Sequence, residues 1–171
     1  MADGRVLQAF QTRRHDHAAC VDRAVEAARG MCERRGLRLT ALRRRVLELV
    51  WSGHGPMRAY DILDRLREER RSAAPPTVYR ALDFLVANGL AHRIESLNAY
   101  VGCGAPGRDH VGQFLICRAC DAVAELDDRT ISRTLADRTR AIGFQLESST
   151  IEIRGLCPAC RAGAGEPSHA V

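Results

Sequence analysis

The cysteines of this 171-residue chain are its most specific chemical feature. Four of the seven form two Cys-x2-Cys pairs, Cys117 with Cys120 and Cys157 with Cys160, and 36 residues separate the pairs. Such a pair presents both sulfurs on one side of a turn, and four thiolates make the tetrahedral set that zinc prefers. Because four protein ligands leave no open coordination position, we expect a structural zinc. Two redox-active pairs are the alternative, but a thioredoxin-like motif belongs near a βαβ pattern, which the sequence lacks.

A second group of metal-binding residue types is spread more widely along the chain. His92, Cys103, His110 and Glu125 offer two nitrogens, a sulfur and an oxygen, and a divalent ion held by all four would be formally neutral. A thiolate with two imidazoles favours zinc over harder cations. Taken singly, His92 fits a surface residue, Cys103 a small buried hydrophobe and Glu125 a solvated strand residue. Spacing alone leaves both interpretations open.

The basic residues, all 26 of them arginine, are unevenly distributed. Residues 1–95 hold 18 arginines against 12 acidic residues, whereas residues 96–171 hold eight against nine. A basic first half favours a nucleic acid partner, although surplus arginine can also form a solvated surface. No apolar run exceeds four residues, far short of a membrane span, so we expect a cytoplasmic protein with no membrane partner.

Hydrophobic periodicity predicts three short helices in the first half. Thr40 can cap the first, whose apolar residues recur at helical spacing: Leu42, Val46, Leu49 and Val50. The second is predicted over residues 57–70. The third begins near Thr77 and stops at Gly89, which can adopt the left-handed conformation. Two strands, residues 90–95 and 98–102, follow as a hairpin. This order is typical of a winged-helix DNA-binding domain.

The second half predicts a small domain of both strands and helix. Residues 113–116, 122–126 and 149–153 have strand character, and residues 127–142 have an apolar helical face. The predicted fold class is therefore α+β, an N-terminal winged-helix DNA-binding domain followed by a small α/β dimerisation domain with a four-cysteine zinc site. Five segments are predicted: a polar N-terminal extension (1–22), the winged-helix domain (23–102), a linker (103–112), the dimerisation domain (113–161) and a disordered tail (162–171).

Several short motifs also occur in a characteristic order, ahead of the two cysteine pairs: Arg38-Leu39-Thr40, Ala59-Tyr60-Asp61-Ile62-Leu63, Pro76-Thr77-Val78-Tyr79-Arg80-Ala81-Leu82-Asp83-Phe84-Leu85, Gly89-Leu90 and His92. Over about residues 24–161 the chain resembles the ferric uptake regulator superfamily, and most of all its zinc uptake regulator branch. In that branch the sensor ligands are a wing His, a Cys eleven positions on, a His before the first cysteine pair and a Glu five positions after it. The resemblance thus implies that His92, Cys103, His110 and Glu125 bind a regulatory zinc.

The same resemblance implies a function and its partners. The chain would be a homodimeric, zinc-dependent repressor of zinc-uptake genes that binds two zinc ions per chain and a pseudo-palindromic double-stranded DNA operator. The third helix would enter the major groove, where Tyr79 and Arg80, with Thr77 at its start, contact base edges. The expected phosphate contacts are Arg38, Arg43, Arg44, Arg45 and Arg58.

Particular residues argue against two other functions. An iron- or peroxide-responsive regulator of the same superfamily is the alternative, but the iron-type members carry a His-rich run near the first cysteine pair, where this chain has only His110. A hydrolytic zinc enzyme would need an open coordination position, and both four-ligand sets are closed. We therefore expect no enzyme activity.

Overall fold

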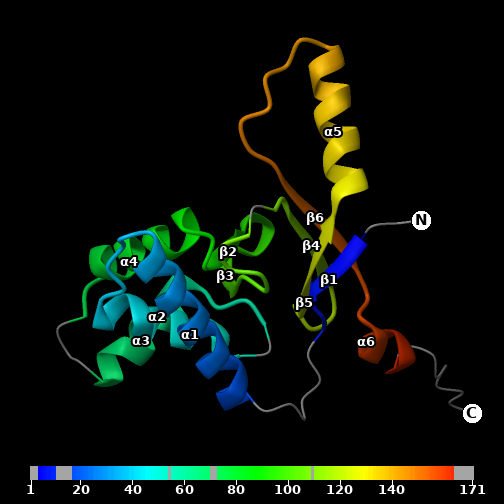
Figure 1. Cartoon of the computed structure of the whole chain (residues 1–171). Helices are drawn as coiled ribbons and strands as arrows, with labels where there is room; N and C mark the ends of the chain where they lie inside the picture. Colours follow the sequence, from blue (N-terminus) through cyan, green and yellow to red (C-terminus); the bar gives the residue numbers. More distant parts are fainter. Residues whose placement is uncertain (1–3, 11–16, 54, 70–72, 109, 164–171) are drawn as a thin grey trace, which may run out of the picture. The chain divides into compact units, whose positions relative to one another are not determined.

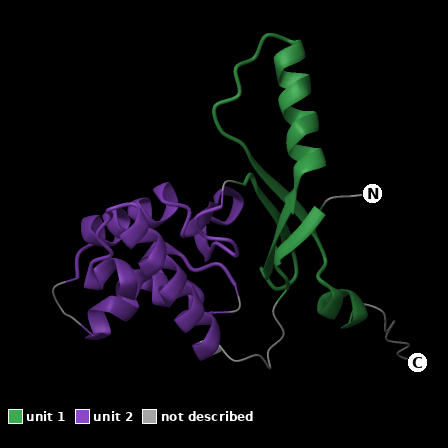
Figure 2. Cartoon of the chain, in the orientation of Figure 1, with its two compact units in different colours: residues 1–10, 110–171 green, residues 11–109 purple. Residues whose placement is uncertain are grey.

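The structure is a computed structural model that describes residues 4–10, 17–53, 55–69, 73–108 and 110–163. These residues form two compact units, shown in Figures 1 and 2: a helical unit within residues 11–109, and a sheet unit that joins residues 110–163 to residues 4–10. The elements are both helices and sheets, so the predicted α+β class is confirmed. Every helix that the structure describes is too short or too polar to span a lipid bilayer.

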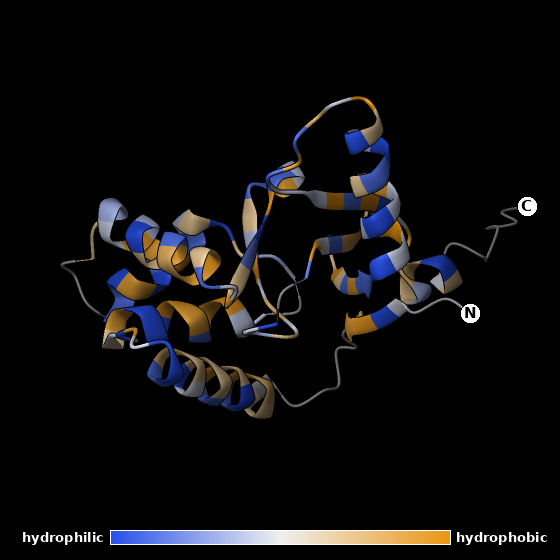
Figure 3. Ribbon diagram, turned by 45° about the horizontal axis from the view of Figure 1, so that its top comes forward, coloured by the Kyte–Doolittle hydropathy of each residue, from blue (hydrophilic) through white to orange (hydrophobic). Residues whose placement is uncertain are grey.

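The helical unit is built from four helices, each of which buries one apolar face. They are α1 (His17–Arg34), α2 (Ala41–Trp51), α3 (Ala59–Glu69) and α4 (Pro75–Ala87). Hydrophobic and hydrophilic residues alternate along their ribbons (Figure 3), as burial of one face requires. Their shared core includes Val46, Ile62 and Leu82, none of which is exposed to solvent.

The observed helix ends follow the capping chemistry of the sequence. Thr40 is the N-cap of α2, and its hydroxyl oxygen accepts a hydrogen bond from the backbone N–H of Arg43 at 3.4 Å. Helix α4 begins at Pro75, slightly before the predicted start near Thr77, because proline is tolerated in the first turn of a helix. Gly89 follows the C-cap Asn88 with a φ of 64°, the left-handed conformation expected for it.

The predicted hairpin follows α4. Strands β2 (Ala91–Ile94) and β3 (Ala99–Gly102) pair antiparallel, and the short 3-10 helix η1 (Glu95–Leu97) connects them. An isolated bridge between Met57 and Tyr100 ties the hairpin to the segment before α3. The three predicted helices and the hairpin are thus present in the order that defines a winged helix.

The sheet unit contains four strands in the order β1-β5-β4-β6. Strand β4 (Gly112–Cys117) lies at the centre, antiparallel to β5 (Val123–Asp128) and parallel to β6 (Thr150–Gly155). Helix α5 (Arg129–Ala141) follows β5 directly, and a short helix α6 (Pro158–Gly163) follows β6. The sequence predicted the three strands β4, β5 and β6 and helix α5 within a few residues, but it did not predict α6.

The N-terminal residues differ from the prediction of a polar extension over residues 1–22. Strand β1 (Gly4–Gln8) pairs antiparallel with β5 and completes the sheet, and α1 already begins at His17. The strand escaped sequence analysis because it is short and its partner lies far along the chain. Most of the predicted disordered tail, residues 164–171, lies outside the described residues, and Ala162 and Gly163 belong to α6.

Candidate metal centres and nucleic-acid interface

The two cysteine pairs meet at one end of the sheet unit. Cys117 ends β4 and is in register with Gly155, which ends the parallel neighbour β6. The turn after β4 therefore brings Cys120, and the turn into α6 brings Cys157 and Cys160, to the same edge. The four Sγ atoms all lie within 4.8 Å of one another, and those of Cys120 and Cys157 are 3.9 Å apart. This grouping is the one that the sequence predicted.

Backbone N–H groups also point at these sulfurs. The N–H of Cys157 donates to Sγ of Cys117 at 3.3 Å, and the N–H of Cys160 donates to Sγ of Cys157 at 3.4 Å. The first of these bonds lowers the pKa of Cys117 to about 6, so this thiol ionises readily to the thiolate that metals bind. The neighbouring Cys120, Cys157 and Cys117 sulfurs raise the pKa of Cys160 to about 12. Four clustered sulfurs with N–H donors fit a tetrahedral zinc or another soft cation.

Outside the cysteine site, the sheet unit contains one further pair of metal-donor side chains among its described residues. Nε2 of His110 is 2.8 Å from Oε1 of Glu125, and the two side chains are only 4% and 2% exposed. Glu125 projects from β5 in register with Phe114 of β4, so the central ladder of the sheet holds it in place. A buried imidazole beside a buried carboxylate is an uncommon arrangement unless the pair serves a specific role.

The helical unit contributes a donor pair of its own at the end of its hairpin. His92 of β2 is in register with Val101, and Cys103 lies two residues beyond Val101. Residues opposite each other and residues two apart share a face of a sheet, so both side chains lie on one face. A ring nitrogen of His92 lies within 4.8 Å of Sγ of Cys103, which is 2% exposed. The four predicted sensor residues thus divide evenly between the two units.

The residue that supports this hairpin end was not predicted from the sequence. A Cβ atom placed on Gly102, next to Cys103, would lie 2.0 Å from Cε2 of Trp51 in α2. The indole therefore packs directly on the backbone of Gly102, and only glycine fits there. No local motif reports this contact, because Trp51 and Gly102 belong to elements far apart in the sequence.

The predicted base-reading residues lie on the exposed side of α4. Thr77, Tyr79 and Arg80 are all exposed near its N-terminal end, whereas Val78 between them is buried. Two of the predicted phosphate-contacting residues, Arg38 and Arg58, are also exposed. The N-terminal part of a recognition helix is the part that contacts base edges, so this placement suits the predicted role.

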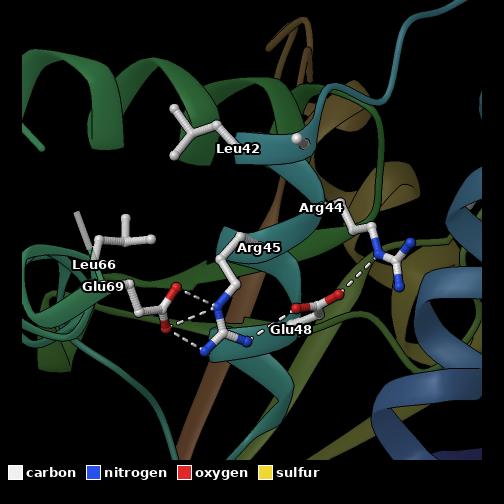
Figure 4. Close-up of a pocket in the computed structure, with 7 residues that line it drawn as sticks. Leu42, Arg44, Arg45, Glu48, Leu66 and Glu69 are labelled. Carbon is white, nitrogen blue, oxygen red and sulfur yellow. Dashed lines mark hydrogen bonds and ion pairs between the residues drawn. The ribbon is translucent and has the colours of Figure 1, made fainter.

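The other three arginines already have partners within the helical unit. Arg43 stacks on the Phe84 ring with its Cζ 3.6 Å from the ring centroid, and it donates to the carbonyl of Arg38 at 2.7 Å. Arg44 donates to Glu48 at 2.8 Å. Arg45 forms ion pairs with both Glu48 of α2 and Glu69 of α3, as Figure 4 shows. Arg44, Arg45, Glu48 and Glu69 line a pocket of about 300 Å³ together with Ala41, Leu42 and Leu66.

Comparison with known proteins decides the family. The family model described as "Ferric uptake regulator family" matches residues 34–154. The chain belongs to the ferric uptake regulator family. It is 42% identical over 134 residues to the zinc uptake regulation protein of Escherichia coli, with 78% of each chain covered. It is 29% identical over 130 residues to the zinc uptake regulation protein of Mycobacterium tuberculosis, covering 74% of this chain and 97% of the other.

Two solved structures are similar to this family member over most of its length. A zinc uptake regulator complexed with zinc and DNA is 38% identical, with a TM-score of 0.82, covering 85% of this chain and 98% of the other. The structure of holo XcZur is 47% identical, with a TM-score of 0.76, covering 81% and 96%. The predicted resemblance to the zinc uptake regulator branch is thereby confirmed.

Proposed function

We propose that this protein is a zinc-responsive, DNA-binding repressor of zinc-uptake genes, with zinc as its corepressor. The observation that carries the proposal is the distribution of the metal-donor side chains over the two units. One complete four-sulfur set lies within the sheet unit, while each unit also holds one close donor pair, His92 with Cys103 and His110 with Glu125. A relative named for zinc uptake regulation and a similar structure that contains zinc and DNA support the choice of metal and partner.

The four-sulfur set holds a structural zinc in this proposal. Cys117, Cys120, Cys157 and Cys160 join the ends of β4 and β6 and the start of α6, so their ligation stabilises a small domain with a limited core. Structural zinc sites of this kind contribute folding free energy directly. A second zinc, the regulatory one, makes two per chain.

The regulatory zinc takes His92, Cys103, His110 and Glu125 as ligands. Two of these belong to the helical unit and two to the sheet unit, so shared ligation restricts the relative orientation of the two units. Zinc binding then favours the arrangement of the two units in which α4 binds DNA. Shifting a population from 1:99 to 99:1 needs about 10⁴-fold preferential binding, or about 5.5 kcal/mol, which a four-ligand zinc site supplies. By reciprocity, operator DNA tightens zinc binding by the same factor.

Helix α4 reads the operator in this proposal. Tyr79 contacts a thymine methyl group and Arg80 makes bidentate hydrogen bonds to guanine, with Thr77 at the helix start, and each good pair is worth about 1–3 kcal/mol of discrimination. Arg38 and Arg58 contact phosphates. Arg43, Arg44 and Arg45 join them only by sharing or exchanging their present partners Phe84, Glu48 and Glu69. Such phosphate contacts set affinity and salt dependence.

The protein acts as a homodimer in the cytoplasm, where its DNA partner lies. Helix α5 has no buried residue, and five large hydrophobic residues of the sheet unit are exposed: Val6, Ile131, Ile142, Phe144 and Ile153. Exposed apolar groups of this kind suit a twofold interface, and two copies of α4 then read the two halves of a pseudo-palindrome. No catalytic step belongs to this function.

The test is a titration of operator binding against free zinc, combined with metal analysis of the purified protein. We expect two zinc ions per chain and operator affinity that rises with free zinc. Parallel titrations with Fe²⁺, and addition of hydrogen peroxide to the zinc-loaded complex, test the alternative. Release of DNA by peroxide, or activation by iron at lower free concentration than zinc, would overturn the proposal in favour of an iron- or peroxide-responsive regulator.

A further inference from the structure

One buried polar side chain has no part in either metal centre. Among the residues that the structure describes, the fully buried polar or charged ones are Glu125, which belongs to the donor pair with His110, and Gln113, which is 1% exposed. A buried carboxamide is costly unless its donors and acceptor are all satisfied, so its position in the central strand β4 calls for a physical reason.

The Gln113 carboxamide bonds to the junction between β5 and α5. Its Nε2 donates to the carbonyl of Asp128 at 2.9 Å and to the hydroxyl of Ser132 at 3.0 Å. Its Oε1 accepts from the backbone N–H of Asp128 at 3.3 Å. The Ser132 hydroxyl in turn donates to the Asp128 carbonyl at 3.2 Å, which closes the network.

This arrangement extends the sheet by a side chain. The ladder of β4 with β5 runs from the Ile116–Val123 pair to the Gln113–Leu126 pair, so Asp128 lies two residues beyond the end of this ladder, while on its other side it pairs with Gly4 of β1. The carboxamide offers Asp128 one donor and one acceptor, as the peptide group of a neighbouring strand does. It therefore fixes the last residue of β5, which is also the N-cap of α5.

The N-cap residue determines the direction in which α5 leaves the sheet. The Asp128 carboxylate accepts hydrogen bonds from the N–H groups of Thr130 and Ile131, so the first turn of α5 is tied to Asp128 and Asp128 is tied to Gln113. Since α5 has no buried residue, few apolar contacts within the described sheet unit compete with this polar tie. Hydrogen bonds at this half-buried junction thus contribute more than usual to the orientation of this helix.

We propose that Gln113 is the positioning residue that orients α5 and, through it, the dimerisation surface of the protein. The inference rests on the proposed function, which places Ile131 and the other exposed apolar residues of this unit in a twofold interface. It also links that interface to the regulatory metal, because Glu125 lies on the same strand three residues before Asp128, and His110 lies three residues before Gln113. The donor pair therefore lies three residues along the chain from the carboxamide network on both strands.

The test compares the dimer dissociation constants of zinc-loaded full-length variants, measured by analytical ultracentrifugation. Gln113→Leu introduces an apolar side chain of similar size and removes all three carboxamide hydrogen bonds. We expect its dimer dissociation constant to rise about tenfold. Ser132→Ala removes one partner and should raise it about threefold. Ser148→Ala, at an exposed serine of the same unit, is the matched control and should leave it unchanged.

Two further measurements separate positioning from general destabilisation. The Gln113→Leu protein should retain its four-cysteine zinc, and the amide of Asp128 should exchange hydrogen faster while the amides of β4 and β6 keep their protection. A dissociation constant within twofold of the wild type would overturn the inference. Loss of the four-cysteine zinc or of the folded sheet unit would also overturn it, because Gln113 would then support the whole unit. If the wild type itself is monomeric or binds its operator without zinc, the proposed function fails instead.

Discussion

The contact between Trp51 and Gly102 gives a stability prediction with a magnitude. A Cβ atom on Gly102 would lie 2.0 Å from Cε2 and 2.1 Å from Nε1 of the indole, whereas carbon atoms in contact normally stay at least about 3.5 Å apart. Gly102→Ala therefore forces the ring or the hairpin to move by more than about 1 Å. Overpacking of this kind costs typically about 1–3 kcal/mol, and we expect about 2 kcal/mol here.

Urea unfolding measures this cost directly, because Trp51 is the single tryptophan of the chain and its fluorescence reports on the helical unit. With a slope of about 2 kcal/mol per molar urea, the midpoint should fall by about 1 M. Gly53→Ala is the matched control in the same unit, since its new Cβ would meet nothing closer than a backbone oxygen at 3.7 Å. Equal midpoints for the two variants would show that Trp51 does not pack on Gly102 as described.

Three further predictions concern the four-sulfur set and the arginines. Cys120→Ser should lose the structural zinc and unfold the sheet unit, whereas the control Cys20→Ser in α1 should keep the zinc and the folded unit. A Cys120→Ser protein with wild-type zinc content and melting would contradict the structural role of this zinc. Arg80→Ala should relax preference at one base position, while Arg44→Ala should weaken binding to all sequences and lower the salt slope by about one; identical, sequence-independent losses would refute the base-reading role of α4. Arg45→Ala should destabilise the helical unit by about 1 kcal/mol, discounted for its partly exposed ion pairs with Glu48 and Glu69. Burial alone would raise the pKa of Glu48, but hydrogen bonds from Arg45 and Arg44 hold this pKa below its usual range. The stability difference between the wild type and Arg45→Ala should therefore shrink as pH falls below about 4, where Glu48 becomes protonated. A stability difference that grew in acid would contradict the assignment.

Features set by local chemistry were predictable from the sequence. The Thr40 cap, the apolar repeat of α2 and the left-handed Gly89 placed the helices, because each signal needs only residues within one or two turns. The grouping of the two Cys-x2-Cys pairs was likewise predictable, since each pair is a local motif and zinc prefers four ligands.

Features that depend on distant partners were not predictable in the same way. Strand β1 is defined by its pairing with β5, and the need for glycine at position 102 of β3 by the Trp51 indole of α2. Gln113 reads as an ordinary polar strand residue, and only the fold shows that it is buried against Asp128. The arginines of α2 show the opposite limit, since the sequence predicts three phosphate contacts where the structure gives each an internal partner.

The central claim is that zinc bound outside the four-sulfur set controls DNA binding. The most direct test measures operator affinity against free zinc for the wild type, Cys103→Ser and the matched control Cys20→Ser. Serine is a far poorer zinc ligand than a thiolate, so Cys103→Ser should keep the dimer and the structural zinc but lose zinc-dependent operator binding. The Cys20→Ser protein should titrate as the wild type does. An unchanged zinc midpoint in Cys103→Ser would contradict the account, because the helical unit would then lack the thiolate through which zinc is proposed to act.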